Sequence, residues 1–331
     1  MKIALITPAA PRSRYGNRNT AARWAGLLRE LGHRVAVQVT WDGAPAHLMI
    51  ALHARRSHDS MIRFRAAFPE RPLVLALTGT DLYRDIRSDA SARLSMAVAD
   101  RLIVLQDMGL RELAPAMRRK TRVIYQSAAQ AAFRAPLRSR FEVVVSGHLR
   151  EEKDPFRAAA ALSLLPPQSR IHVTHVGGAM NNAMEREARA WMAREPRYRW
   201  LGERAHWEAL QLLARCRVMV ISSRMEGGAN VVCEALAAGI PVIASRISGN
   251  IGMLGRGYAG YYAVENERAL ARALLRVETD PRFLRLLRSQ CAARSTLVRR
   301  NREKKALARL LSEVVPAVTG RERRQRRHRA R

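Results

Sequence analysis

The fold is decided by the stretch Ser222–Val242, which reads SSRMEGGANVVCEALAAGIPV. It follows the apolar run Arg217–Ile221, which is typical of a buried strand, and it continues in a helical pattern. Gly227 and Gly228 allow the backbone of the loop between this strand and this helix to approach a ligand closely. The N–H groups at the helix start, near Asn230, attract a phosphate or diphosphate because the positive end of the helix dipole lies there.

Two carboxylates flank this predicted anion site, Glu226 in the loop and Glu234 about one turn into the helix. A carboxylate repels an anion, so each is better placed to accept hydrogen bonds from hydroxyl groups. One acid on each side of a diphosphate suits a ribose at one end and a sugar at the other. The alternative is a helix start with two incidental acids.

Outside this stretch, short apolar runs alternate with helical patterns, as in parallel sheets whose strands are joined by helices. The expected strands are Lys2–Thr7, Arg34–Thr40, Leu48–Leu52, Leu73–Leu77, Arg101–Leu105, Arg122–Tyr125, Phe141–Ser146, Ile171–Val176, Arg217–Ile221 and Val242–Ala244. The first expected helix begins near Thr20. The others cover Pro155–Leu165, Glu185–Arg194, Val231–Ala238, Glu265–Val277 and Pro281–Leu311, the last as one long helix.

The length of 331 residues predicts two domains of roughly 150 residues each. We expect a Rossmann-like acceptor domain at 1–128, a linker at 129–140, a Rossmann-like donor domain at 141–300, and a helix end with an Arg-rich tail at 301–331. The predicted fold class is α/β, with two doubly wound parallel-sheet domains that face a cleft. Such sheets bind ligands beyond the carboxyl ends of their strands.

The chain is strongly basic, with 59 Lys and Arg against 28 Asp and Glu and a formal net charge of +31. Only five of the 59 are lysines, a bias that we interpret as a habit of composition. The scattered excess is read as a solvated surface, or as a weak field that attracts acidic substrates. Aromatic residues make up 5%, and no nucleic-acid-binding module is recognisable, so we expect no nucleic-acid partner.

Several classes of protein are excluded by what the sequence lacks. No apolar run approaches the ~20 residues of a membrane span, and Pro8 breaks the opening strand too early for a signal peptide. We therefore expect a cytoplasmic protein without stable membrane insertion. Cys216, Cys233 and Cys291 are odd in number and lack paired spacing, which argues against a disulfide framework or zinc site. No Asp-x-Asp occurs, and we predict neither a metal nor another cofactor.

The two glutamates eight positions apart, followed by Ala-Leu-Ala-Ala-Gly-Ile-Pro-Val, resemble the family 4 nucleotide-sugar glycosyltransferases of the GT-B fold. The resemblance covers nearly the whole chain. It implies that Glu226 contacts the donor sugar, that Glu234 holds the ribose, and that the helix start contacts the diphosphate. The donor-binding residues that it implies are Gly147, His148, Gly228, Asn230, Val231 and Glu234.

A second motif, Ser146–Pro155 (SGHLREEKDP), joins a strand to a helix, with Asp154 as the expected N-cap. It resembles the family's Gly-Arg-Leu…Glu-Lys element, whose Arg and Lys clamp the diphosphate. Lys153 falls on the family lysine, but His148 stands at the arginine position and Arg150 follows two residues later. Either Arg150 or a pH-dependent bond from His148 completes the clamp. A surface Lys/Arg pair is the alternative. The implied catalytic residues are Lys153, Glu226 and Arg150.

The loop between the first strand and the first helix corresponds in position to the family's glycine-rich loop. Its Arg12, Arg14 and Arg18 suit an anionic acceptor, although loop arginines are common in so Arg-rich a chain. Asp81 ends a strand and either faces the cleft or caps the next turn, and His53 is favoured as structural. The candidate acceptor-binding residues are Gly16, Asn17, Arg18, Thr20 and Asp81.

Further strings are similar to one branch of that family, the selenosugar synthases of selenoneine biosynthesis. The strings are Ile6–Ala9, Gly16–Thr20, Glu226–Glu234, Ala244–Gly255 and Gly257–Tyr262. This branch moves a hexose, N-acetylglucosamine or glucose, from UDP-N-acetylglucosamine or UDP-glucose to selenophosphate, forming a C–Se bond and a 1-selenosugar. The resemblance thus implies a metal-independent hexosyltransferase.

Two alternatives to this function stay open. The first is a family 4 enzyme that acts on a lipid or polysaccharide hydroxyl at a membrane surface, and the second is a polyanion-binding protein with a degenerate enzyme fold. The preferred hexose, the stereochemistry of transfer, cleavage of the P–Se bond and the oligomeric state also stay open.

Overall fold

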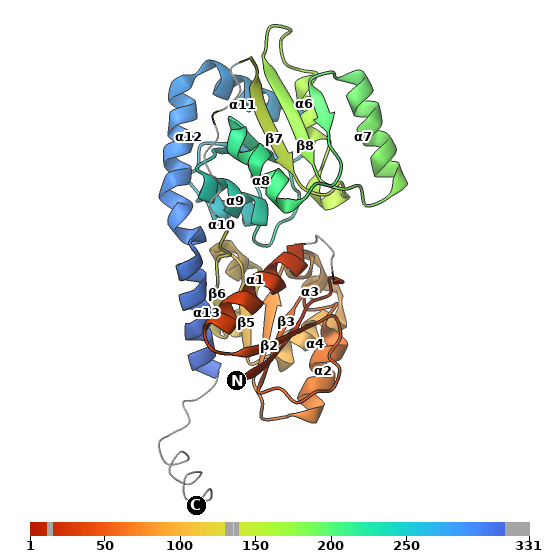
Figure 1. The fold of residues 1–331 in the computed structure, drawn as a ribbon, viewed down its shortest axis with the longest axis vertical. Coiled ribbons are helices and arrows are strands. Elements are labelled where there is room, and N and C mark those ends of the chain that lie inside the picture. The colour runs from red at the N-terminus through yellow and green to blue at the C-terminus, as the bar shows by residue number, and fades with distance from the viewer. Residues whose placement is uncertain (12–15, 130–134, 136–138, 315–331) are drawn as a thin grey trace, which may run out of the picture. The chain divides into compact units, whose positions relative to one another are not determined.

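A computed structural model describes the chain except for residues 12–15, 130–134, 136–138 and 315–331. The chain divides into two compact units (Figure 1). Unit 1 contains Met1–Leu105, Leu113–Ile124 and Glu303–Arg331, and unit 2 contains Gln106–Glu112 and Tyr125–Arg302. Most of the linker expected at 129–140, and the tail after Val314, lie outside the described residues.

Unit 1 contains a six-stranded parallel sheet in the order β2-β1-β3-β4-β5-β6. The strands are β1 (Lys2–Ile6), β2 (Arg34–Gln38), β3 (Leu48–Leu52), β4 (Leu73–Leu77), β5 (Arg101–Val104) and β6 (Thr121–Val123). Each overlaps an expected strand. Every residue of β3 and β4 is buried, as in the central strands of a parallel sheet that is covered on both faces.

The helical segments before residue 124 include several that the sequence analysis did not predict, among them α2 and α4. They are α1 (Gly16–Glu30), α2 (His58–Ala67), the π-helical turn η1 (Asp81–Asp85), α3 (Ile86–Ser88), α4 (Ala90–Val98), the 3₁₀ turn η2 (Asp107–Glu112) and α5 (Pro115–Arg119). Trp24 and Leu28 of α1 are wholly buried against Leu5 and Ile50 of the sheet.

The single helix expected at Pro281–Leu311 is wrong. The structure has α12 (Pro281–Arg294), the 3₁₀ turn η4 (Ser295–Val298) and α13 (Arg300–Val314). The Ser295 hydroxyl donates to the carbonyl of Ala292 at 2.7 Å, and such back-bonding weakens a helix. The β-branched Thr296 and Val298 weaken it further.

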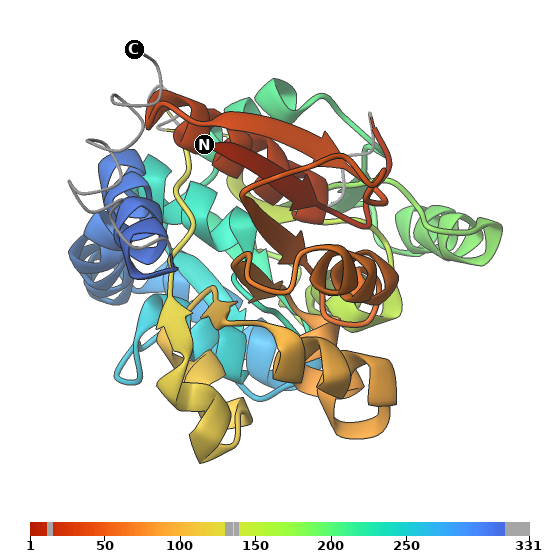
Figure 2. The ribbon, with the colours of Figure 1, turned by 90° about the horizontal axis from the view of Figure 1, so that it is seen from below.

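Helix α13 belongs to unit 1 from Glu303 onward and is drawn in blue in Figures 1 and 2. Leu307, Leu310 and Leu311 lie in the same core as Trp24. Glu303 is 0% exposed, and its carboxylate accepts hydrogen bonds from Trp24 Nε1 at 2.7 Å and from Arg23 Nε at 3.1 Å. A buried carboxylate requires such partners, so these two bonds fix α13 on α1.

Unit 2 contains a second six-stranded parallel sheet, in the order β12-β11-β10-β7-β8-β9. Its strands are β7 (Phe141–Ser146), β8 (Ile171–Val176), β9 (Tyr198–Trp200), β10 (Val218–Ile221), β11 (Val242–Ser245) and β12 (Tyr261–Tyr262). Its other helical segments are η3 (Glu151–Lys153), α6 (Arg157–Leu162), α7 (Asn182–Arg194), α8 (His206–Arg215), α9 (Asn230–Ala238), α10 (Ser248–Leu254) and α11 (Glu267–Thr279). The strands β9 and β12 were not predicted, since three and two residues are too few to show a period.

The expected N-cap at Asp154 is also wrong. Helix α6 begins at Arg157, and Asp154 follows the 3₁₀ turn η3 with a left-handed φ of 45°. Its carboxylate accepts a hydrogen bond from Arg157 Nε at 2.8 Å. The Ser222 hydroxyl contacts the carbonyl oxygens of Asp154 at 2.8 Å and of Lys153 at 3.0 Å. The end of β10 thus fixes the backbone that the sequence suggested would start a helix.

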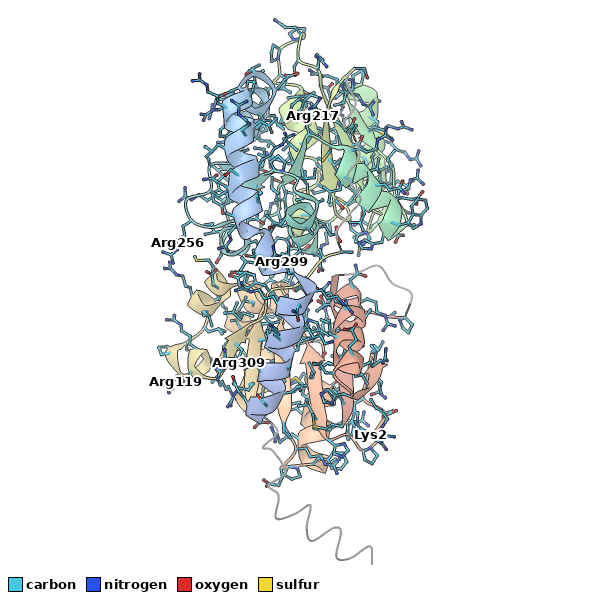
Figure 3. All side chains as sticks on the ribbon, turned by 60° about the vertical axis from the view of Figure 1, so that its left-hand side comes forward. Lys2, Arg119, Arg217, Arg256, Arg299 and Arg309 are labelled. Carbon is cyan, nitrogen blue, oxygen red and sulfur yellow. The ribbon has the colours of Figure 1, made fainter. Side chains whose placement is uncertain are left out.

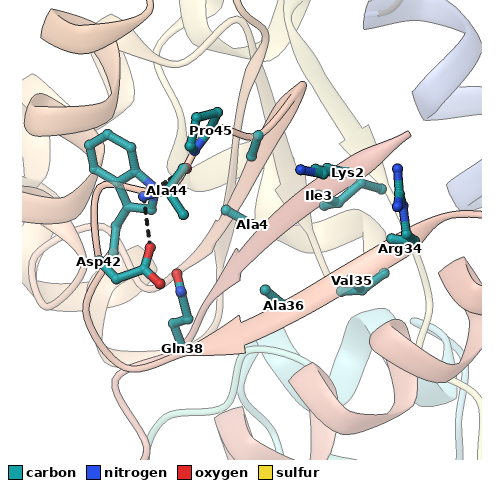
Figure 4. A pocket seen from close by; sticks show the side chains of 12 residues that line it. Lys2, Ile3, Ala4, Arg34, Val35, Ala36, Gln38, Asp42, Ala44 and Pro45 are labelled. Carbon is teal, nitrogen blue, oxygen red and sulfur yellow. Dashed lines mark hydrogen bonds between the residues drawn. The ribbon is translucent and has the colours of Figure 1, made fainter.

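A cavity of about 320 Å³ lies at the β1–β2 edge of unit 1 (Figure 4). Lys2 stands in register with Arg34, and Ala4 with Ala36, so the hollow has short side chains in its floor and two cations at one end. The connection from β2 to β3 contains no helix that would cover it. Basic residues are also found on elements away from the cavity, among them Arg119 of α5 and Arg309 of α13, which are labelled in Figure 3.

We expect Glu303→Ala to lower the free energy of unfolding by about 3 kcal/mol, because it leaves the Arg23 guanidinium and the Trp24 N–H without their buried acceptor. Urea denaturation followed by circular dichroism measures this loss. The matched control is Glu30→Ala, which removes a more exposed ion pair with Lys304 and costs less than ~1 kcal/mol. Equal losses in the two variants would contradict the assigned role of Glu303.

His175 of β8 is 1% exposed, and burial lowers its pKa from 6.5 to about 4. Between pH 6.5 and pH 4, His175 is therefore protonated in the unfolded chain but neutral in the folded chain. This contribution to stability is present above pH 6.5 and is lost as the pH falls toward 4. We expect wild type to lose about 2 kcal/mol more than His175→Gln between pH 7 and pH 5. Urea titrations at the two pH values measure it, and parallel losses would show that His175 does not titrate this way.

Candidate functional site

The predicted strand is β10 of unit 2, and the glycine loop and the predicted helix follow its carboxyl end. Strand β10 ends at Ile221, and α9 begins at Asn230, where the sequence placed it. The N-cap of this helix is Ala229, whose methyl side chain makes no hydrogen bond to the first turn. The positive end of the helix dipole lies at Asn230 and Val231, so the backbone there is suited to an anion.

Two of the predicted catalytic residues meet here. Lys153, at the end of η3, donates from Nζ to Oε1 of Glu226 in the glycine loop. The Ser223 hydroxyl donates to the same oxygen at 2.6 Å. Only 8% of the Glu226 side chain is exposed, against 20% of the Lys153 side chain. A carboxylate so buried is stable when a cation and a hydroxyl compensate its charge, and both are present.

The backbone of Glu226 is held from behind by α10. A Cβ atom added to Gly249 would lie 2.0 Å from the Glu226 carbonyl oxygen, so a residue with a side chain does not fit there. The Ser245 hydroxyl donates to the Ser223 carbonyl at 2.6 Å, and Asn250 Nδ2 donates to the Ser245 carbonyl at 2.9 Å. These contacts fix the loop at Ser223 and at Glu226 itself.

Glu234 lies on α9, and 14% of its side chain is exposed. Its Oε1 is 2.8 Å from Nε2 of His206, the first residue of α8, whose side chain is 62% exposed. The sequence analysis did not find His206. A recognisable strand before α8 would have pointed to His206, but β9 has only three residues, too few to show a period.

His148 and Arg150, the two candidates for the role of the family's diphosphate-binding arginine, have different surroundings. His148 Nδ1 accepts a hydrogen bond from the Gly178 N–H at 3.2 Å, and Gly147 accepts one from His175 through its carbonyl. The side chain of Arg150 is 42% exposed and lies beside Glu152, with 4.0 Å between Nε and Oε2. In the described part of the chain it is Lys153 that reaches Glu226.

The candidate acceptor residues lie in unit 1. Gly16 begins α1 and is exposed, Asn17 and Arg18 are half-buried, and the hydroxyl of the buried Thr20 donates to the Gly16 carbonyl at 3.0 Å. Arg12 and Arg14 fall outside the described residues.

Asp81 is wholly buried in the loop after β4. Its Oδ1 accepts from the Thr78 and Gly79 N–H groups at 2.9 and 2.8 Å, and its Oδ2 accepts from Ala54 N at 3.0 Å. These bonds run to the turn that precedes Asp81 and to the loop after β3, not to the next turn that the sequence analysis considered. His53 is also buried, with Nε2 3.1 Å from the Thr80 hydroxyl, and burial lowers its pKa.

Three features of the described residues bear on the chemistry. No group of three or more His, Cys, Asp or Glu side chains there could hold a metal ion. No helix in the same residues is both long and apolar enough to cross a membrane. The three cysteines, all within the described ranges, are buried free thiols.

Comparison with known proteins places this geometry in context. HepE of Anabaena, solved in complex with UDP and glucose, is 19% identical, with a TM-score of 0.76 over 95% of this chain and 100% of that one. The sucrose-phosphate synthase of Thermosynechococcus elongatus is 18% identical, with a TM-score of 0.77 over 94% of this chain and 98% of that one. These likenesses confirm the predicted fold class, α/β with two Rossmann-like parallel sheets of the GT-B type.

The glycogen synthase of Mycobacterium tuberculosis is 33% identical over 158 residues, which are 45% of this chain and 37% of that protein. The chain thus matches little more than a third of the length of this curated relative. The family model for group 1 glycosyl transferases matches residues 130–296, about half of the chain, including the whole Lys153–Glu226–Glu234 site. The protein therefore belongs to the group 1 glycosyl transferases.

Proposed function

We propose that the protein transfers a hexose from UDP-N-acetylglucosamine or UDP-glucose to selenophosphate. The observation that carries the donor half of this proposal is the Lys153–Glu226 pair beside the start of α9, with Glu234 on the same helix. This arrangement offers a cation and backbone N–H groups to a diphosphate, with one carboxylate on each side for hydroxyl groups. HepE, which was crystallised with UDP and with UDP-glucose, supports a UDP-sugar as donor.

The chemistry requires stabilisation of the leaving group. Glycosyl transfer passes through an oxocarbenium-like transition state while the departing diphosphate gains negative charge. Lys153 and the start of α9 supply positive charge at that point, so we propose that the reaction needs no metal. Glu226, oriented by Ser223, accepts a hydrogen bond from a hydroxyl of the sugar, and Glu234 accepts from the ribose.

The acceptor half of the proposal rests on the resemblance to selenosugar synthases and on the start of α1, where Gly16 is exposed and Asn17 and Arg18 are half-buried. Selenophosphate is already anionic at neutral pH, so it requires positioning and no base. Its selenium forms a bond to the anomeric carbon while the C–O bond to UDP breaks, and UDP leaves with the electron pair. Attack of water on phosphorus then breaks the P–Se bond and releases the selenol and inorganic phosphate.

The direct test is incubation with UDP-N-acetylglucosamine and selenophosphate, followed by mass spectrometry. A sugar that carries selenium supports the proposal, and UDP-glucose run in parallel decides the donor. Thiophosphate and a plain alcohol serve as competing acceptors. A product formed with the alcohol alone would favour the lipid or polysaccharide alternative, and no product with any acceptor would overturn the proposal.

Lys153→Ala and Glu226→Ala are each expected to lower kcat by about 10²–10³-fold, the usual cost of removing one preorganised group that stabilises developing charge. Steady-state rates at saturating UDP-sugar measure this. Because Lys153→Ala leaves Glu226 buried without its cation, thermal unfolding of each variant is measured alongside. Lys304→Ala, on α13, is the matched lysine control. Wild-type turnover in folded Lys153→Ala and Glu226→Ala would remove both residues from the site.

Arg18→Ala is expected to raise KM for selenophosphate more than KM for the UDP-sugar, because it removes a cation next to the proposed acceptor site. Initial rates with each substrate varied in turn separate the two constants. Arg29→Ala, at the other end of α1, is the control and is expected to change neither. An equal rise of both constants in Arg18→Ala would show that Arg18 does not act on the acceptor.

A further inference from the structure

Three loops interlock at the carboxyl edge of the unit 2 sheet. The loop after β7 bonds to the end of β8 through Gly147 N to Val176 O at 2.8 Å, and to the loop after β8 through Leu149 N to Gly178 O at 2.9 Å. The loop after β8 bonds to the loop after β9 through Gly177 N to Gly202 O at 2.9 Å. The first of these loops carries His148 and Lys153 toward the proposed donor site.

Gly177 brings the first two loops into direct contact. It has a φ of 152°, and a Cβ atom added to it would lie 1.9 Å from the carbonyl oxygen of Gly147. The carbonyl of Gly147 is thus enclosed by backbone on one side. That carbonyl also accepts a hydrogen bond from a side chain that lies outside the proposed donor site.

That side chain is His175, on the central strand of the three. Its Nε2 is 3.1 Å from the Gly147 carbonyl oxygen, beyond β7, and its Nδ1 is 2.9 Å from the Tyr198 hydroxyl, on β9. A carbonyl oxygen only accepts, so Nε2 carries the proton and Nδ1 accepts from the tyrosine. Burial lowers the pKa of His175 to about 4 and raises that of Tyr198, so both groups are neutral at pH 7 and the tautomer is fixed.

The loop from Gly147 to Lys153 is therefore anchored at both ends. His175 anchors the Gly147 carbonyl, and the Ser222 hydroxyl anchors the carbonyl of Lys153 at 3.0 Å. Between these points the loop determines where the Lys153 ammonium and the His148 ring lie. A displacement of about 1 Å at a catalytic group can cost 10²-fold in rate, even when the change that causes it is remote from the chemistry.

We propose that His175 is a positioning residue for hexosyl transfer, whose Nε2–H fixes the Gly147 carbonyl and, through it, the loop that presents His148 and Lys153 to the UDP-sugar. The proposal rests on the function proposed above. His175 touches no substrate in it. A residue that only filled the core would be replaceable by any side chain of similar size, whereas this role requires a hydrogen-bond donor at the place of Nε2.

A matched pair of variants separates the two roles. In His175→Gln the side-chain amide nitrogen reaches the place of Nε2 and keeps the bond to Gly147, whereas in His175→Asn it reaches only the place of Nδ1. Both variants remove the imidazole ring. We expect kcat with UDP-N-acetylglucosamine to fall at least tenfold in His175→Asn and to stay within about threefold of wild type in His175→Gln. KM and the thermal midpoint are measured for each.

Amide hydrogen exchange of the peptide covering residues 147–153 provides a readout that needs no activity. It is expected to be faster in His175→Asn and unchanged in His175→Gln. Equal kcat in the two variants, or activity that follows only their thermal midpoints, would overturn the positioning role. If wild type transfers no sugar from any UDP-sugar, the proposed function fails. In that event the exchange data still decide the loop contact, and wild-type exchange in His175→Asn refutes it.

Discussion

The ion pair between Lys153 and Glu226 is the interaction on which the site depends. The two residues follow β7 and β10, which are neighbours in the sheet of unit 2, so the pair joins two adjacent carboxyl ends. An almost wholly buried carboxylate without a cation would be strongly destabilising, and this cost forces the loop after β7 to fold over the loop after β10. Ser222 and Ser223 complete the junction by bonding to the Lys153 carbonyl and the Glu226 carboxylate.

The close approach of these loops restricts what can surround them. Gly177 and Gly249 stand where a Cβ atom would overlap a carbonyl oxygen, of Gly147 in one case and of Glu226 in the other. Both carbonyls belong to loops that carry proposed site residues. The backbone is thus packed as tightly as the side chains of the core, which leaves the polar groups of the loops few alternative positions. Rigid placement of charge is what electrostatic catalysis requires, because groups already in place need no rearrangement during the reaction.

Much of this fold could be predicted because buried parallel strands have apolar runs that stand out between helical patterns. The start of α9 at Asn230 was predicted for the same reason, with a glycine loop marking the boundary. The failures have specific causes. Asp154 resembles an N-cap locally, but Ser222, distant in sequence, holds its backbone in a left-handed turn. His206 contacts Glu234, which lies 28 residues away on α9. His175 contacts Tyr198 on β9 and Gly147 in the loop after β7. No local sequence pattern reveals such contacts.

The two proposed donor acids differ in how readily they can accept a ligand. Each already has a nitrogen partner, Lys153 for Glu226 and His206 for Glu234. In the proposed complex the donor's hydroxyl groups bind these carboxylates beside or in place of these partners. The His206 side chain is 62% exposed and can turn toward solvent, whereas the Lys153 side chain is 20% exposed and stays beside Glu226, where its charge meets the diphosphate in the proposed complex. In the proposed complex the sugar end is therefore preorganised and the ribose end adapts, which places the rigid half of the site where the bond breaks.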